Sequence, residues 1–265
     1  MIKTIEFKGT QCFYRTEGKG KAVMLVHGFV EEGSMWNGTL QALSKNYKVI
    51  APDLPGFGQS SMINSKLSME TYAELLHKIL EKEKVKQCIL IGHSMGGYAA
   101  LYFAENHPSF LKGLGLINSH CFEDSAEKKG NRKKGNEFIA NYGTKVFVNE
   151  IYNNLFHSSF KKKNQKLIKE MIADAEKYLP QALIATNIAM MNRKDKSHVL
   201  TETKVPVLLI SGKEDETVPL EYSLKQASFA AVTDFHLFDK TKHMSVFEKK
   251  KETIAAIENF IECCC

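Results

Sequence analysis

The feature of the sequence that most restricts the fold is the pentapeptide Gly92-His93-Ser94-Met95-Gly96. It follows a short run of β-branched and apolar residues at 87–91 and opens a run typical of a helix at 95–106. A serine between two glycines at a strand-to-helix turn occupies a sharp, strained bend, where small neighbours let the backbone pack closely. We therefore expect the Ser94 hydroxyl above the edge of a sheet, at a helix N-terminus that favours a developing negative charge.

On both sides of this turn, short runs typical of strands alternate with longer runs typical of helices. The predicted strands are an N-terminal hairpin at 2–7 and 12–15, followed by 22–26, 47–51, 87–91, 113–117, 205–210 and 233–238. The predicted helices around them are 34–45, 68–84, 95–106, 220–230 and 247–261. This order favours an α/β fold with a mainly parallel sheet and helices on both faces.

Residues 121–204 contain no run typical of a strand, and several helical segments are predicted there, at 136–142, 145–156, 165–178 and 180–192. We therefore predict a core domain made of 1–120 and 205–265, interrupted by a helical insert at 121–204. The insert carries 16 Lys and Arg against 10 Asp and Glu, a surplus equal to the net charge of +6 of the whole chain. Its basic clusters at 128–129, 132–134 and 161–163 are consistent with attraction of anionic substrates, nucleic acid or acidic membranes, but a solvated helical face is the favoured interpretation.

Composition excludes several classes of protein. With 265 residues, 43% hydrophobic and 25% charged, the chain is neither disordered nor collagen-like nor a disulfide scaffold. No apolar run reaches the roughly 18 residues of a membrane span, and the N-terminus lacks the apolar core of a signal peptide, which predicts a cytoplasmic protein. The six cysteines show no zinc-like spacing, so no metal is expected, and Cys263-Cys264-Cys265 is interpreted as a frayed, oxidisable end.

Three segments carry a resemblance to a known family. The segment 25–29 contains His27-Gly28 directly after a predicted strand, the segment 53–60 reads D-x-P-G-x-G-x-S, and the segment 92–97 contains the serine turn. In this order and spacing they resemble the α/β-hydrolase superfamily, and the resemblance runs across nearly the whole chain. It implies the α/β-hydrolase fold, with an eight-stranded sheet and an inserted helical cap, in the branch of capped, esterase-like serine hydrolases.

The resemblance implies a catalytic triad in the chain order serine, acid, histidine. Ser94 is the nucleophile, and a weakly nucleophilic hydroxyl needs a base that is in turn oriented by an acid. Of nine histidines, His243 occupies the loop before the last helix where the family places its base. Asp215 fits the G-x-x-D-x-x-V-P register of 212–219. Its neighbours Glu214 and Glu216 are weaker alternatives, and Asp124 marks a position that some relatives use.

The same resemblance places the oxyanion hole at the backbone N–H groups of Phe29 and Met95. The predicted reaction is cleavage of a small carboxylic ester through an acyl-enzyme intermediate, with no metal or organic cofactor. The predicted partner is a small ester or acyl substrate, with no nucleic acid and no membrane expected, and the sequence does not reveal the oligomeric state. Side chains expected to line the pocket are Phe29, Trp36, His120, Phe122, Tyr152 and Phe156, with Phe138, Tyr142, Phe147 and Met190 as further candidates.

Other activities remain open within this fold. Relatives with the same triad include thioesterases, carbon–carbon bond hydrolases, lactonases, perhydrolases and the synthase-lyase of menaquinone biosynthesis. Tyr98 stands where that lyase usually has an arginine, and 29–33 lacks the Gly-rich stretch usual in carbon–carbon hydrolases. An alternative of another class is a ligand sensor of the stress-signalling kind with slow or no turnover. Salt-dependent binding of nucleic acid to the basic insert is a third, weaker alternative.

Overall fold

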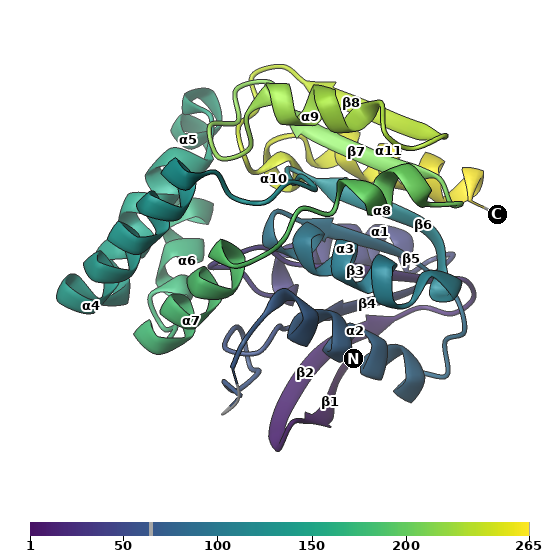
Figure 1. Cartoon of the computed structure of the whole chain (residues 1–265), viewed down its shortest axis with the longest axis horizontal. Coiled ribbons are helices and arrows are strands. Elements are labelled where there is room, and N and C mark those ends of the chain that lie inside the picture. Colours follow the sequence, from purple (N-terminus) through teal and green to yellow (C-terminus); the bar gives the residue numbers. More distant parts are fainter. Residues whose placement is uncertain (64–65, 265) are drawn as a thin grey trace.

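One eight-stranded sheet forms the centre of the molecule in the computed structural model, which describes residues 1–63 and 66–264 (Figure 1). The strands lie in the order β1-β2-β4-β3-β5-β6-β7-β8. β2 pairs antiparallel with β1 and β4, and the remaining neighbours are parallel, which confirms the predicted mainly parallel sheet. The strands are β1 (Ile2–Phe7), β2 (Thr10–Glu17), β3 (Ala22–Val26), β4 (Lys48–Pro52), β5 (Cys88–His93), β6 (Leu111–Ile117), β7 (Val207–Gly212) and β8 (Thr233–Phe238).

Helices cover both faces of the sheet, as predicted. α2 (Met69–Lys82) and α3 (Met95–Asn106) contribute to the larger hydrophobic cluster, and α1 (Asn37–Leu43) and α11 (Lys250–Cys263) to the smaller one. α9 (Leu220–Ala227) follows β7, and the short α10 (Ser245–Glu248) precedes α11. Short 3-10 turns at Gly33–Trp36 and Pro108–Phe110 precede α1 and β6.

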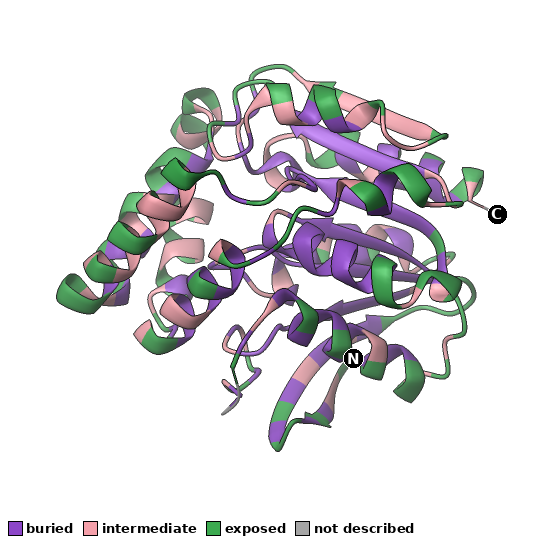
Figure 2. Ribbon diagram, viewed as in Figure 1, coloured by how far each residue is buried: buried purple, intermediate pink, exposed green. Residues whose placement is uncertain are grey.

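β3 shows how the sequence produces a sheet that is buried on both sides. All five of its residues are buried, and they alternate between the two clusters. Val23 and Leu25 contact the smaller cluster, whereas Met24 and Val26 contact the larger one. This alternation follows from the two-residue period of a strand. Figure 2 shows the result as a buried sheet centre with exposed residues on the outer helices.

An insertion made only of helices separates β6 from β7, and all but its last helix lies beside the sheet in Figure 1. It comprises α4 (Ala126–Leu155), α5 (Ser158–Lys163), α6 (Gln165–Ala175), α7 (Pro180–Met191) and α8 (Ser197–Glu202). α4 begins ten residues before the predicted start at 136, and it carries a non-helical residue, Gly143, with φ of 79°. Its first turns are polar and lack an apolar period, so the sequence pattern did not reveal them.

Two further expectations concern membranes and cysteines. Among residues 1–63 and 66–264, no helix is long and apolar enough to cross a membrane. Cys263 is the last residue of α11 and is exposed. The expectation of a frayed cysteine end is wrong for Cys264, which packs against the smaller cluster. Cys265 lies outside the described residues.

Candidate active site

Ser94 sits in a strained turn between β5 and α3. Its backbone has φ of 49° and ψ of −116°, a left-handed conformation that is unfavourable for any residue with a Cβ atom. The two flanking glycines have no room for a side chain. A Cβ atom on Gly92 would lie 2.2 Å from the carbonyl carbon of Gly96, and one on Gly96 would lie 2.4 Å from the carbonyl oxygen of Val26. The G-x-S-x-G spacing is therefore a requirement of backbone packing at this turn.

The structure brings Ser94, His243 and Asp215 into one hydrogen-bonded chain. Ser94 Oγ lies 2.8 Å from His243 Nε2, and His243 Nδ1 lies 2.8 Å from Asp215 Oδ2. Because a carboxylate only accepts hydrogen bonds, Nδ1 carries the hydrogen and Nε2 is left to accept the Ser94 hydroxyl proton. The arrangement can therefore pass a proton between Ser94 and His243 while Asp215 orients the ring.

Asp215 is held as a carboxylate by several donors. Its Oδ1 accepts hydrogen bonds from the backbone N–H groups of Thr217 (2.8 Å) and Val218 (3.0 Å). Its Oδ2 also accepts one from the Asn118 side chain at 3.0 Å. Burial raises the pKa of Asp215, but the charge of His243 and these hydrogen bonds outweigh burial and hold that pKa below its usual value. Asn118 was not found from the sequence, since no motif marks it.

The loop that carries His243 is anchored from two directions. The backbone N–H of His243 donates to the carbonyl oxygen of Leu155, at the end of α4, at 3.0 Å. Its own carbonyl oxygen accepts a hydrogen bond from His93 Nε2, while His93 Nδ1 lies 2.9 Å from Glu31 Oε2. Burial lowers the pKa of His93, but the Glu31 charge and hydrogen bond outweigh burial and raise that pKa above its usual value.

The backbone amides of Phe29 and Met95 were predicted to bind an oxyanion. Met95 N–H is the first amide of α3, directly after Ser94, and Phe29 follows Gly28 after β3. Gly28 approaches the serine so closely that a Cβ atom on it would lie 3.2 Å from Ser94 Cβ. Within the described residues, neither amide has a hydrogen-bond acceptor in the protein. The Met95 amide thus directly follows Ser94, the Phe29 amide follows the glycine that approaches Ser94, and both amides are free to donate.

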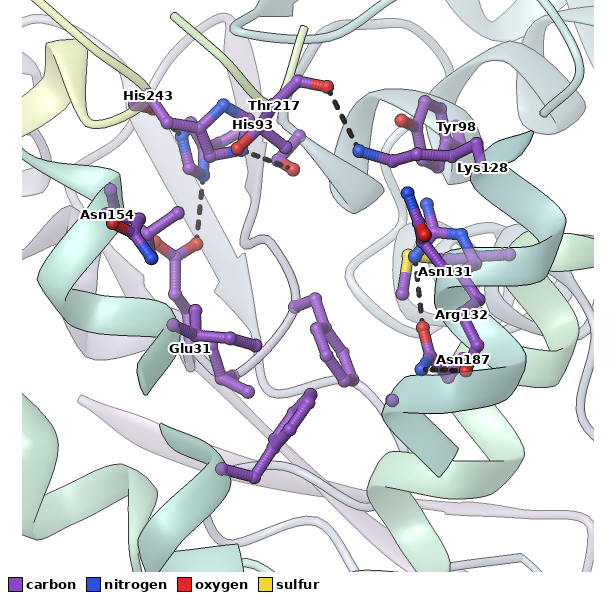
Figure 3. A pocket seen from close by; sticks show the side chains of 18 residues that line it. Glu31, His93, Tyr98, Lys128, Asn131, Arg132, Asn154, Asn187, Thr217 and His243 are labelled. Carbon is purple, nitrogen blue, oxygen red and sulfur yellow. Dashed lines mark hydrogen bonds and ion pairs between the residues drawn. The ribbon is translucent and has the colours of Figure 1, made fainter. Parts of the chain in front are cut away.

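A cavity of about 290 Å³ opens beside Ser94 and His243 (Figure 3). Its walls come from the loop after β3, from α4 and α7 of the helical insertion, and from the loops that carry Thr217 and His243. The apolar side chains lining it are Phe29, Val30, Phe147, Ile151, Leu155 and Met190. The polar ones besides Ser94 and the two histidines are Glu31, Tyr98, Lys128, Asn131, Arg132, Asn154, Asn187 and Thr217. A cavity that combines apolar walls with polar and charged groups beside a nucleophile can hold a small molecule.

Of the six side chains predicted to line the pocket, only Phe29 lines this cavity. Trp36 is fully buried in the smaller cluster, because the turn that carries it packs on the far face of the sheet. Phe156 is buried and stacks on Phe160, and Phe122 packs against Tyr222 and Phe229.

The last two predicted pocket residues lie next to other cavities. His120 faces Tyr98 and Arg193, and it borders a separate hollow with Asp124 and Tyr222. Burial, aided by Arg193, lowers the pKa of His120 to about 3, so this ring is neutral near pH 7. Tyr152 donates its hydroxyl hydrogen to the Val30 carbonyl oxygen at 2.9 Å and lines a neighbouring cavity of about 190 Å³.

Asp124, an alternative acid in the sequence, does not contact His243. Its Oδ2 lies 2.5 Å from Arg132 Nε and its Oδ1 lies 2.6 Å from Arg193 Nη1. The expectation of a solvated basic face is likewise wrong for Lys128 and Arg132, which line the cavity. A helical period of 3.6 residues places them on one face of α4, but the sequence does not tell which face meets the core.

Comparison with protein families gives one match over most of the chain. The family described as "alpha/beta hydrolase fold" matches residues 21–250. A pimeloyl-[acyl-carrier protein] methyl ester esterase of Vibrio cholerae is 26% identical over 239 residues, which make up 87% of this chain and 90% of that protein. An uncharacterized protein of Mycobacterium tuberculosis is 33% identical over 119 residues, but this match spans only 35% of that protein's length and 44% of this chain.

Solved structures agree in fold. A thermophilic esterase from Thermogutta terrifontis, described with malate bound, superposes with a TM-score of 0.92 at 27% identity, covering 99% of this chain and 97% of that one. An enol-lactonase from Burkholderia xenovorans superposes with a TM-score of 0.89 at 20% identity, covering 98% of this chain and 100% of that one. At that identity, the second likeness concerns the fold alone.

Proposed function

The chain belongs to the alpha/beta hydrolase fold family, and from this premise we propose that it is a serine hydrolase that cleaves a small carboxylic ester through an acyl-enzyme intermediate. The observation that carries the proposal is the hydrogen-bonded chain from Ser94 through His243 to Asp215, with 2.8 Å at both links. Such a chain turns a weakly nucleophilic hydroxyl into a nucleophile.

In the proposed reaction, Ser94 Oγ attacks the ester carbonyl carbon while His243 Nε2 accepts the hydroxyl proton. His243 then donates this proton to the leaving alcohol, and the acyl group remains on Ser94. A water molecule attacks the acyl-enzyme with His243 again as the base, which releases the acid and restores Ser94. Asp215 holds the ring in the required tautomer and stabilises its positive charge. This chemistry requires neither a metal nor an organic cofactor.

The tetrahedral intermediates would place their negative oxygen against the amides of Phe29 and Met95. Both amides lack a protein acceptor within the described residues. Donors that are already oriented stabilise the oxyanion without reorganisation at the moment of reaction, and loss of one such donor typically reduces the rate by about a hundredfold or more.

We assign residues 121–204 to a cap and residues 1–120 and 205–265 to the catalytic core. The assignment is supported by the cavity, because α4 and α7 supply its wall opposite the nucleophile. A wall of this kind excludes water from the site and sets the shape of the substrate. The names of the relatives from Vibrio cholerae and Thermogutta terrifontis, both esterases, support an ester as the bond that is cleaved.

The experiment that tests the proposal is steady-state hydrolysis of p-nitrophenyl acetate, butyrate and octanoate. We expect turnover by the wild-type protein and loss of at least about a thousandfold in kcat for Ser94→Ala. Ser109→Ala, which removes an exposed hydroxyl from the 3-10 turn after α3, should behave as wild type. If the wild-type protein hydrolysed none of the three esters, the result would instead favour a sensor with slow turnover.

A further inference from the structure

Two cations of the insertion face the candidate active site. Lys128 and Arg132 are one turn apart on α4 and both line the cavity next to Ser94. In Figure 3, they lie with Asn131 and Asn187 on one wall, across the cavity from Glu31 and His243. Positive charge is thus concentrated on the wall that the insertion supplies.

The positive charge of this wall is only partly balanced inside the protein. Asp124 forms ion pairs with both Arg132 and Arg193, so a single negative charge balances two guanidinium groups only in part. Arg132 is held further by a hydrogen bond from its Nη1 to Asn187 Oδ1 at 3.0 Å. Lys128, Arg132, Arg193 and Asp124 together carry a net charge of +2.

Lys128 is the cation that lacks a counter-ion. Within residues 1–63 and 66–264 its ammonium group forms no ion pair, and its one hydrogen bond is a long one of 3.4 Å to the Thr217 carbonyl oxygen. Burial and the nearby Arg132 lower the pKa of Lys128 below its usual value, and they outweigh the opposite effect of the Asp124 and Asp215 charges. A half-buried ammonium beside another cation is unfavourable unless an anion joins it. The cavity that it faces is where such an anion can enter.

We propose that Lys128 binds a carboxylate carried by the substrate, so that the preferred substrates are esters with a negatively charged group away from the bond that is cleaved. This inference rests on the proposed ester hydrolysis and narrows its substrate class. The Lys128 ammonium pairs with the carboxylate, and the fixed Arg132 adds a second positive charge nearby. The apolar residues Phe29 and Phe147 contact the carbon chain between the two ends of the substrate.

The test compares charged esters with neutral ones of the same shape. Monomethyl adipate carries the carboxylate in its acyl part, and 6-acetoxyhexanoate carries it in its alcohol part. The primary amides of both compounds are the neutral controls. Acid release is followed by titration at constant pH, and kcat/KM of each charged ester is divided by that of its amide. The member of the pair with the larger ratio shows on which side of the ester bond the carboxylate belongs.

Lys128→Met should lower this charged-to-neutral ratio by at least about tenfold, because it removes one partner of a partly desolvated charge pair. The matched control is Lys133→Met, which removes an equal charge from an exposed position on the same helix. It should leave the ratio at the wild-type value. A ratio near one in the wild type, or an unchanged ratio in Lys128→Met, would overturn the inference while leaving ester hydrolysis intact.

A binding measurement separates this inference from the proposed reaction. Ser94→Ala protein is titrated with monomethyl adipate and with 6-acetoxyhexanoate by calorimetry, so the result does not depend on turnover. Saturable binding of at least one of them that weakens at least about tenfold on adding Lys128→Met supports the carboxylate site. Failure of both to bind, or equal affinity with and without Lys128, contradicts it. Retained hydrolysis by Ser94→Ala would instead refute the proposed nucleophile, with the binding result still deciding the role of Lys128.

Discussion

His93 Nε2 donates a hydrogen bond to the backbone carbonyl oxygen of His243 across 2.9 Å, so the residue directly before the candidate nucleophile holds the loop of its base. The other ring nitrogen of His93 faces the Glu31 carboxylate, which can only accept. Both ring nitrogens therefore carry hydrogens, and the ring is a buried imidazolium paired with Glu31. Glu31 Oε2 also accepts from the Gly28 amide at 2.7 Å, which ties the oxyanion loop to the same pair.

The first prediction concerns this pair. Glu31→Gln removes the counter-charge of His93, and loss of one partner of a buried pair should cost about 3 kcal/mol in the free energy of unfolding. We expect kcat to fall about tenfold with little change in KM, since His243 would lose its fixed position while the cavity remains. Urea denaturation and steady-state kinetics measure the two effects.

The matched control for that change is Glu32→Gln. Glu32 is the next residue, its side chain is 26% exposed, and its ion pair with Arg15 is long at 3.4 Å. A partly exposed pair contributes roughly 0–1 kcal/mol, so the variant should remain close to wild type in stability and in kcat. If Glu31→Gln and Glu32→Gln had the same free energy of unfolding and the same kcat, a positioning role for Glu31 would be contradicted.

The second prediction concerns the serine turn. Gly96→Ala would place a methyl group 2.4 Å from the Val26 carbonyl oxygen and 2.6 Å from that of His27, both on the backbone. We expect a loss of about 3 kcal/mol or more in the free energy of unfolding and no detectable esterase activity. Thermal unfolding followed by circular dichroism measures the change.

Gly130→Ala provides the comparison for Gly96→Ala. Gly130 lies within α4, and nothing lies within 4 Å of the position of an added Cβ atom. Alanine should therefore raise stability by up to about 1 kcal/mol through its higher helix propensity. A normal melting temperature in Gly96→Ala would show that the backbone does not pack as described.

The resemblance to a known family assigned Ser94, Asp215 and His243 each to the loop that follows one strand, so their proximity could be predicted from the sequence. The sequence also predicted all eight strands, since alternation and apolar runs are local properties. The pocket was not predictable in this way. Phe29 and Trp36 are both aromatic and near each other in sequence. Only the three-dimensional packing decides that Phe29 faces the cavity and that Trp36 faces the far side of the sheet. Glu31 and Asn118 carry no motif, and their roles depend on partners 62 and 97 residues away.

The third prediction concerns pH and Asp124. Burial raises the pKa of Asp124, but Arg132 and Arg193 outweigh burial and hold that pKa below the usual value of 3.8. A carboxyl with a lowered pKa in the folded state contributes stability above its unfolded value and loses it as the pH falls through its folded value. Asp124→Asn should thus lower the free energy of unfolding by about 3 kcal/mol at pH 7 and pH 5, and by less at pH 3.

Glu123→Gln is the control for Asp124→Asn, because the Glu123 side chain is 53% exposed. It should change the free energy of unfolding by no more than about 0.5 kcal/mol at any of these pH values. Urea denaturation of both variants and the wild type at the three pH values gives the comparison. If the loss of unfolding free energy in Asp124→Asn, relative to the wild type, grew as the pH falls, Asp124 would not be stabilised as an anion.

The central claim, that Ser94 forms an acyl-enzyme, is tested most directly by covalent labelling with phenylmethylsulfonyl fluoride followed by intact-mass and peptide mass spectrometry. We predict one adduct per chain, located on Ser94, with loss of p-nitrophenyl butyrate hydrolysis in proportion to labelling. Asp215→Asn should label far more slowly, because His243 would lose its required tautomer. An adduct on another residue, or full activity in protein labelled at Ser94, would contradict the claim.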